Sequence, residues 1–136
     1  MRLDAGTARR LFGAARVARL GTAGSDGLPR VVPVTFAVLG ERVVTAVDHK
    51  PKRTADLRRL RDIRANPNVS LLVDHYEDDW TRLWWARADG SAQIADEAER
   101  AEALDALVAK YDQYAGRRPE GPVIVVAVTR WSGWRY

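Results

Sequence analysis

The first half of the chain alternates apolar and polar positions in a way that predicts one short helix followed by strands. Asp4 or Thr7 can cap the helix. Residues 16–22, 31–39 and 42–47 have the pattern of strands, separated by turns rich in Gly, Asp and Pro. Two successive hairpins of this kind predict an antiparallel meander. The apolar side chains at helical spacing are Ala8, Leu11, Phe12 and Ala15.

The second half continues with helices and strands in irregular alternation. Asp96 and Glu99 have the spacing of a capping box, which marks the start of a helix. Asp89-Gly90 is a favoured two-residue hairpin turn. The expected elements are a helix over 54–64, a strand over 69–75, hairpin strands over 81–88 and 91–94, a helix from 97 that ends near 114–116, and a strand over 123–128.

This order of six to seven strands and about three helices is not the regular strand–helix alternation of a parallel sheet. It predicts a mainly β, α+β fold built on an antiparallel barrel. The length of 136 residues is that of one domain, so we expect a single domain over residues 1–136. The apolar content of 46% is enough for a buried core and argues against disorder.

Composition excludes several classes of chemistry. The chain has no Cys, so disulfides, thiolate metal sites and thiol nucleophiles are excluded. No apolar run has the length of a membrane span, and no secretory signal is present, so we expect a soluble, cytoplasmic protein. His49 and His75 are isolated from other ligands, so no metal site is expected.

Positive charge is concentrated in one stretch. Residues 49–64 contain seven Lys or Arg and two Asp, whereas residues 96–105 contain five acids and one Arg. The first stretch therefore carries a charge of +5, which exceeds the net charge of +4 of the whole chain. Residues 48–54, where it begins, lie between a strand end and a helix start. A helix N-terminus attracts anions, so cations placed there predict a phosphate site. Its candidate residues are Lys50, Lys52, Arg53, Thr54 and Arg58.

Two alternatives to a phosphate site remain for this stretch. It can be an ordinary basic loop followed by a solvated helix face. It can also bind nucleic acid, as a sequence pI near 9.8 allows. Asp56 and Asp62 interrupt the run of Arg, and no nucleic-acid motif is present, so we expect no nucleic-acid partner.

Aromatic residues are the second unusual feature. Adjacent residues of a strand point to opposite faces, so at most one of Trp84 and Trp85 lies in the core. Trp131, Trp134 and Tyr136 form an aromatic tail. These rings either pack in the core or serve a flat ligand or a second subunit. Pro33, in the predicted strand over 31–39, cannot donate to a sheet, so that strand must meet a bulge, solvent or a ligand there.

The order of these motifs resembles the split β-barrel proteins of the pyridoxine-phosphate-oxidase-like group, and more closely the actinobacterial branch that uses coenzyme F420. The resemblance covers nearly the whole chain, and the order and spacing of loose motifs carry it. The motifs are PRVVPVTF at 29–36, DHKPKRT at 48–54, the Asn66-Pro67 turn, and WTRLWWAR at 80–87 leading to GSAQI at 90–94.

The resemblance implies a homodimer with two cofactor sites between the subunits. Lys50, Lys52, Arg53, Thr54 and Arg58 would hold the cofactor's phosphate. The strand with Pro33 and Thr35 would run beside the flat ring. Trp85 or Arg87, together with the C-terminal aromatic tail, would approach from the other subunit. Trp80 and Trp134 are the candidate substrate-binding residues.

The cofactor implied is coenzyme F420, with FMN as the alternative. The chain lacks the C-terminal extension of the FMN-using oxidases and their basic motif before the third strand. The function expected is hydride transfer between F420 and a small unsaturated molecule, since the cofactor supplies chemistry for which no catalytic side chain is visible. The alternatives are an FMN-dependent oxidoreductase and a non-catalytic flavin or F420 carrier on the same fold.

Overall fold

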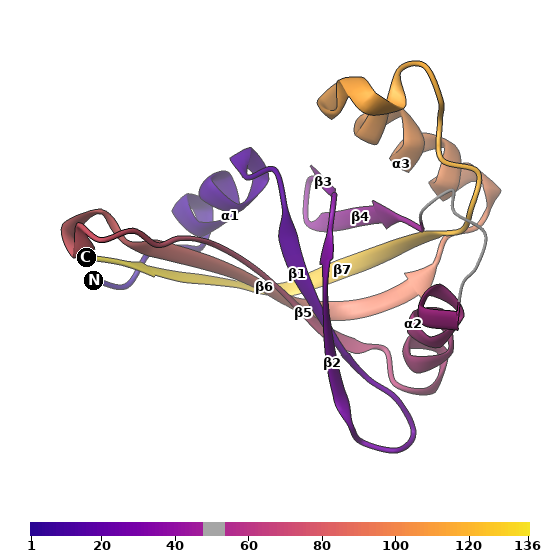
Figure 1. The fold of residues 1–136 in the computed structure, drawn as a ribbon, viewed down its shortest axis with the longest axis horizontal. Helices are drawn as coiled ribbons and strands as arrows, with labels where there is room; N and C mark the ends of the chain where they lie inside the picture. Colours follow the sequence, from indigo (N-terminus) through magenta and orange to yellow (C-terminus); the bar gives the residue numbers. More distant parts are fainter. Residues whose placement is uncertain (48–53) are drawn as a thin grey trace.

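The computed structural model describes residues 1–47 and 54–136, with residues 54–57 described by their backbone alone. It contains one seven-stranded antiparallel sheet in the order β2-β1-β5-β6-β7-β4-β3 (Figure 1). The mainly β, α+β architecture is therefore confirmed. The elements are α1 (Ala5–Ala14), β1 (Ala18–Ala23), β2 (Pro29–Val34), β3 (Ala37–Leu39), β4 (Arg42–Ala46), α2 (Thr54–Ala65), β5 (Asn68–His75), η1 (Trp80–Arg82), β6 (Trp84–Ile94), α3 (Glu97–Lys110), η2 (Asp112–Tyr114) and β7 (Val123–Arg135).

β2 and β3 follow each other in the sequence but form the two opposite edges of the sheet. The prediction of one strand over 31–39 within a meander is therefore wrong. The chain leaves β2 after Val34 and enters β3 at Ala37, so only Thr35 and Phe36 link the two edges. The Phe36 side chain is fully buried in the core at this turn. The Thr45 hydroxyl donates to the Thr35 carbonyl at 2.6 Å and ties the link to β4.

β6 is one continuous strand, so the predicted hairpin at Asp89-Gly90 is wrong. The pairing of β6 with β7 shifts at this point, where Asp89 lies opposite Arg130 and Gly90 opposite Val128. Thr129 is thus an extra residue of β7, and the Asp-Gly pair marks a β-bulge. A Cβ at Gly90 would lie 2.3 Å from the carbonyl oxygen of Ala127, so the close approach of the two strands requires glycine.

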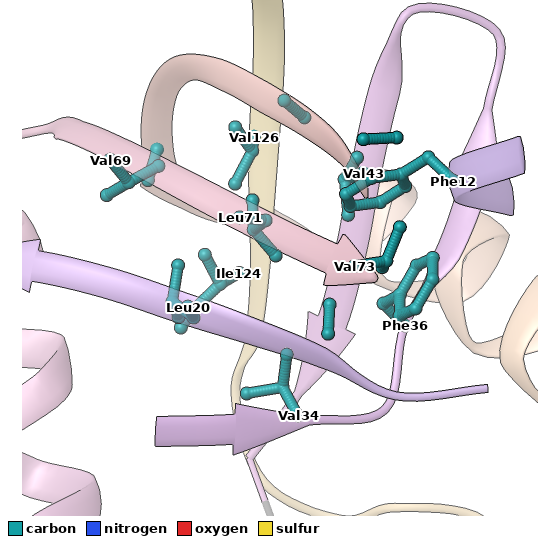
Figure 2. Close-up of a cluster of buried hydrophobic side chains, with 14 of the residues drawn as sticks. Phe12, Leu20, Val34, Phe36, Val43, Val69, Leu71, Val73, Ile124 and Val126 are labelled. Atoms are coloured by element: carbon teal, nitrogen blue, oxygen red, sulfur yellow. The ribbon is translucent and has the colours of Figure 1, made fainter. Parts of the chain in front are cut away.

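The core fills the concave side of the sheet, which we call the inner face. An aromatic cluster lies at one end of it (Figure 2), with the Phe12 ring centroid 4.9 Å from that of Phe36 and 5.5 Å from that of Trp131. Leu20 and Leu71 complete it from β1 and β5 (Figure 2). Burial of each such side chain stabilises the fold by about 1.5–3 kcal/mol.

The helices cover the sheet unevenly. α1 and α2 contribute side chains to the inner-face core, among them Phe12 and Ile63. α3 packs Leu104 and Leu107 on the opposite, outer face, over Val44 of β4 and the start of β7. No described helix packs on the rest of the outer face, which is formed by β2, β1, β5, β6 and the end of β7. No helix in the described part of the chain is long and apolar enough to cross a membrane.

The ends of the helices follow the sequence in part. Asp4 caps α1 by accepting from the Thr7 N–H at 2.7 Å. The predicted capping box of Asp96 and Glu99 is confirmed. α3 ends at Lys110 rather than near 114–116, because Tyr111 adopts an extended conformation. Its hydroxyl is then placed to accept from the Phe36 N–H at 3.1 Å.

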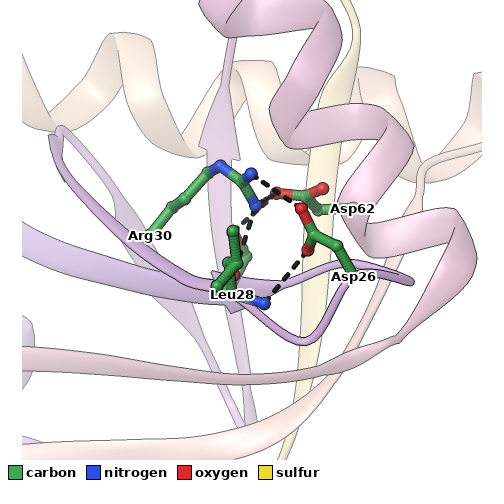
Figure 3. A network of polar contacts seen from close by, with 5 residues as sticks. Asp26, Leu28, Arg30 and Asp62 are labelled. Atoms are coloured by element: carbon green, nitrogen blue, oxygen red, sulfur yellow. Dashed lines mark hydrogen bonds and ion pairs between the residues drawn. The ribbon is translucent and has the colours of Figure 1, made fainter.

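A polar network joins α2, which contains the second part of the basic stretch, to the β1–β2 hairpin. Asp62 of α2 is buried, and its carboxylate lies 3.4 Å from the Arg30 guanidinium, which also binds Asp26 at 3.1 Å (Figure 3). The hydrogen bond from Arg30 lowers the pKa of Asp26. Gly24 lies against Asp62, because a Cβ built there would be 2.3 Å from the Asp62 Oδ1.

We expect Gly24→Ala to destabilise the protein by about 1–3 kcal/mol, because the methyl group would displace the buried Asp62 carboxylate from Arg30. Gly116→Ala is the matched control, since a Cβ at Gly116 meets nothing within 4 Å. Urea unfolding followed by Trp fluorescence would measure both. Equal stability of the two variants would contradict the close contact.

Lys110 provides a second test, based on pH. Its ammonium lies 3.7 Å from the Phe36 ring centroid and donates to the Gly13 carbonyl at 3.2 Å. Burial, together with the charge of Arg16, lowers the pKa of Lys110 from 10.5 to about 8. Between pH 8 and 10 the unfolded chain therefore holds more protons at this side chain than the folded protein does. Stability from this group should rise with pH over that window.

The measurement is the free energy of unfolding at several values from pH 7 to pH 10. The wild type should gain stability relative to Lys110→Met as the pH rises from 8 to 10, because the variant has no group to titrate at this position. The window ends near pH 10, since burial also raises the pKa of Tyr111, whose ionisation acts in the opposite direction. Parallel pH profiles for the two proteins would disprove the assignment.

Candidate functional site

The uncovered outer face of the sheet carries a hollow of about 300 Å³ on β5 and β6. The antiparallel register places Leu72 opposite Arg87 and Asp74 opposite Trp85. Because side chains alternate between faces, these four residues share the outer face. We call this the Trp85–Arg87 hollow; its lining residues are Leu72, Asp74, Tyr76, Trp85 and Arg87.

The two adjacent tryptophans of β6 serve different faces. Trp84 packs against the core cluster on the inner face, whereas Trp85 lines the hollow on the outer face. The prediction that they point in opposite directions is confirmed. Trp85 is therefore available to a ligand or a second subunit.

Arg87 is held in place from one side. Its Nε donates to Asp89 Oδ2 at 3.2 Å, and Asp89 Oδ1 accepts from the Ser70 hydroxyl at 2.6 Å. Its guanidinium carbon lies 5.5 Å from the Trp85 ring centroid, within the range of a cation–π contact. Neither Nη group hydrogen-bonds to another described residue, and the side chain is 40% exposed. The two Nη groups are therefore free to donate to a ligand.

Asp74 supplies the opposite charge on the same hollow. It lies 3.6 Å from Arg19 of β1, a contact between two partly exposed groups. Such a pair is worth at most about 1 kcal/mol. A carboxylate has about four lone-pair sites, so this contact leaves room for another donor at Asp74.

The aromatic tail is part of the sheet and extends this site. β7 runs to Arg135, so Trp134 lies directly opposite Trp85 on the outer face. Its ring centroid is 6.4 Å from that of Tyr136. Trp131, in contrast, packs in the core, so the tail is divided between the two faces. Trp80 lies in η1 and is 70% exposed, with no ring contact to these residues in the described structure.

The candidates on β2 lie elsewhere on the sheet. Pro33 is exposed on an edge strand, which satisfies the requirement that its missing N–H imposes. It is three strands away from Arg87, roughly 14 Å by the spacing of paired strands. Thr35 is half-buried, with its hydroxyl 2.8 Å from that of Tyr114. One chain therefore does not bring Pro33 and Thr35 together with Trp85 and Arg87.

Most of the predicted phosphate site falls outside the described residues. Lys50, Lys52 and Arg53 belong to the undescribed stretch, and Thr54 is the first residue of α2, of whose side chain nothing is described. Arg58 is half-buried on α2, and its charge contributes to lowering the pKa of Asp26, after the hydrogen bond from Arg30. The phosphate site thus stays a prediction.

A second hollow of about 480 Å³ lies on the outer face beside the first. Its lining includes Gly21 and Gly90, which have no side chain to cover the backbone. Ser70 and Asp89, the two residues that hold Arg87 in place, also line it. Among the described residues, no group of three His, Asp or Glu is placed to hold a metal ion. His75 contacts Glu77, which also pairs with Arg82 at 3.2 Å.

Sequence reasoning missed Ser70, Asp74, Tyr76 and Asp89 as parts of a site. The available signal was two series of alternate positions, at 70, 72, 74 and 76 and at 85, 87 and 89, in which every residue except Leu72 is polar or aromatic. Alternate positions mark one face of a strand. The register that brings these two faces together came only with the structure.

Comparison with known proteins agrees with this architecture. A family model described as pyridoxamine 5'-phosphate oxidase matches residues 6–135. No protein of curated function matches the chain. A FAD-binding protein from Mesorhizobium loti has a TM-score of 0.73 at 22% identity, covering 98% of this chain and 95% of its own.

Two further solved structures are similar. A FAD-binding protein from Mycobacterium smegmatis has a TM-score of 0.71 at 21% identity, covering 100% of this chain and 98% of its own. The heme storage protein HutZ of Vibrio cholerae has a TM-score of 0.72 at 15% identity, covering 99% and 95%. At these identities the similarity establishes the fold. Since the family model spans nearly the entire sequence, the chain belongs to the pyridoxamine 5'-phosphate oxidase family and has its split-barrel fold.

Proposed function

We propose that this protein is an oxidoreductase that binds coenzyme F420 between two copies of the chain and transfers a hydride to or from a small unsaturated molecule. FMN is the alternative cofactor. The observation that carries the proposal is the Trp85–Arg87 hollow, which joins an aromatic surface to directed polar groups on a face that no described helix covers. Family membership and the FAD-binding structural neighbours support a flavin-type cofactor.

The residues present fit a flat ring system. Trp85 and Trp134 supply adjacent aromatic surface, and Arg87 supplies donors beside it. The hollow is at the lower end of the range for small-molecule sites, about 300–1,000 Å³, so it suits a ring rather than a whole nucleotide cofactor. The phosphate would then lie elsewhere, in the basic stretch with Lys50, Lys52 and Arg53.

The separation of the two candidate groups supports the proposed homodimer. A ring beside Pro33 and Thr35 does not reach Trp85 of the same chain, since three strand spacings lie between β2 and β6. A second copy packed on the uncovered outer face would bring its own Trp85 and Arg87 to the ring. Val31, which is 67% exposed on that face of β2, would gain a partner there.

When bound, the cofactor would supply the hydride chemistry, and the side chains would bind and orient it. Lys50, Lys52, Arg53, Thr54 and Arg58 would hold the phosphate. Arg87 would fix the ring through its Nη groups, and Trp80 and Trp134 would contact the substrate. The ring surfaces of Trp85 and Trp134 would exclude water from the reacting face.

Carriage of a flavin-type cofactor without turnover is the competing function. A structural neighbour named as a storage protein favours it, because it shows this fold in a protein named for holding a prosthetic group. Both functions require the same binding site. They differ in whether reduced cofactor is reoxidised by an added acceptor such as a quinone or an unsaturated ketone.

The first test is a fluorescence titration of the purified protein with oxidised F420 and, separately, with FMN. We expect saturable binding of F420 that is tighter than that of FMN, and light scattering should give the mass of a dimer. Tighter binding of FMN would move the assignment to the FMN-dependent alternative. Absence of saturable binding for both would contradict the proposed function.

The second test addresses the phosphate site. Lys52→Ala should weaken FMN binding by an order of magnitude or more, because a hydrogen bond to a charged group is worth about 1.5–3 kcal/mol. Riboflavin, which lacks the phosphate, should bind the variant and the wild type equally well. An FMN affinity unchanged by Lys52→Ala would remove this lysine from the site.

A further inference from the structure

We propose that the Trp85–Arg87 hollow recognises the imide edge of a planar heterocycle, with Asp74 accepting from the ring N–H and Arg87 donating to the neighbouring carbonyl. Flavins and deazaflavins have such an edge on their pyrimidinedione ring, and free pyrimidines such as uracil have it too. The inference rests on the proposed function only where the heterocycle is the cofactor's own ring.

The first support is the arrangement of charge around the hollow. Asp74 and Arg87 are diagonal neighbours on paired strands, yet no ion pair joins them in the described structure. Arg87 pairs with Asp89, and Asp74 lies near Arg19. Each charge is therefore balanced from outside the hollow.

The balance of charges around the hollow indicates which kind of ligand it would bind. With two Arg and two Asp in the group, the local net charge is zero, which favours neither an anion nor a cation. The hollow instead presents one acceptor and one donor on diagonal positions of two paired strands. A neutral ring whose N–H and C=O are adjacent satisfies both at once, whereas a carboxylate would satisfy Arg87 and face Asp74.

The second support is the fixed direction of Arg87. Its Nε is occupied by Asp89, so the remaining donors are the two Nη groups at the end of the side chain. Asp89 is in turn held by the Ser70 hydroxyl at 2.6 Å. A donor held in this way loses less conformational entropy when it binds a ligand. Ser70 and Asp89 are therefore positioning residues.

The third support is the shape and polarity of the surface around these groups. Leu72 and Trp85 provide apolar area, and Tyr76, 65% exposed, stands at the rim. Side chains of this type hold a planar ring by stacking and burial. Polar groups at one edge with apolar area beside them match a heterocycle whose polar atoms lie along one side.

The experiment compares lumiflavin with N3-methyl-lumiflavin by quenching of flavin fluorescence. The two probes differ only in the imide N–H, and neither has a phosphate, so binding is independent of the basic stretch. Wild-type protein should bind lumiflavin at least tenfold more tightly, since the methyl group removes the hydrogen bond to Asp74. Equal affinities would overturn the proposal.

Variants assign the effect to the hollow. Asp74→Ala should abolish the discrimination between the two probes, and Asp74→Asn, which retains an acceptor oxygen, should keep part of it. Arg87→Met should weaken both probes, because both retain the carbonyl. Asp112→Ala, at an aspartate in η2, is the matched control and should behave as wild type. Undiminished discrimination in Asp74→Ala, with a native circular dichroism spectrum, would also overturn the proposal.

Further arms separate the possible outcomes. Uracil and 3-methyluracil are titrated by calorimetry into protein with and without saturating FMN. If saturating FMN abolishes the preference for uracil over 3-methyluracil, the heterocycle is the cofactor's own ring. If the preference remains in the presence of FMN, the heterocycle is a separate substrate. Both results support the hollow as an imide site. Binding of FMN without discrimination between the lumiflavins would overturn this inference alone. Discrimination without binding of FMN or F420 would overturn the proposed function alone.

Discussion

The structure depends on a two-residue link between the opposite edges of its sheet. Thr35 and Phe36 connect β2 to β3, which are the two edge strands of the sheet. Because so short a link joins them, the sheet must curve until its two edges lie close together. The Tyr111 hydroxyl holds this link to the end of α3. It accepts from the Phe36 N–H at 3.1 Å, and its single proton is shared between the carbonyls of Phe36 and Arg16, each 3.0 Å away. Without that hydroxyl, the Phe36 N–H beside a buried Phe side chain would lose its partner, at a cost of about 1–3 kcal/mol.

This closure determines where helices can pack. The inner face is filled by the core and by side chains of α1 and α2, while the end of α3 is anchored by Tyr111 and the helix covers only the outer face of β3, β4 and the start of β7. The remaining outer face is left to other partners. Polar residues on it contact one another, since Asp89 binds Ser70 across the strands and Arg87 along β6.

The sequence predicted the elements better than their connections. Helical spacing and caps were sufficient for α1 and for the start of α3, because Asp4 and Asp96 act within a few residues of themselves. The hairpin at Asp89-Gly90 was wrong, because the same dipeptide suits a turn and a bulge, and only the partner strand decides between them. The division of 31–39 into two strands depends on Tyr111, a residue 75 positions away from Phe36. Long-range contacts of this kind leave no local pattern.

The same bulge determines which residues of β7 lie beside the candidate site. On β6 the alternation is unbroken, so Trp85, Arg87 and Asp89 share the outer face. On β7 the inner-face residues are Ile124 and Val126 before the bulge and Trp131 after it, so the extra residue reverses the alternation. Without it, Trp131 would leave the aromatic cluster of Phe12 and Phe36, and Trp134 would turn away from Trp85. A single inserted residue thus serves the core and the outer face together. This explains why Gly90, where a side chain would meet the Ala127 carbonyl, lies beside the residues that support Arg87.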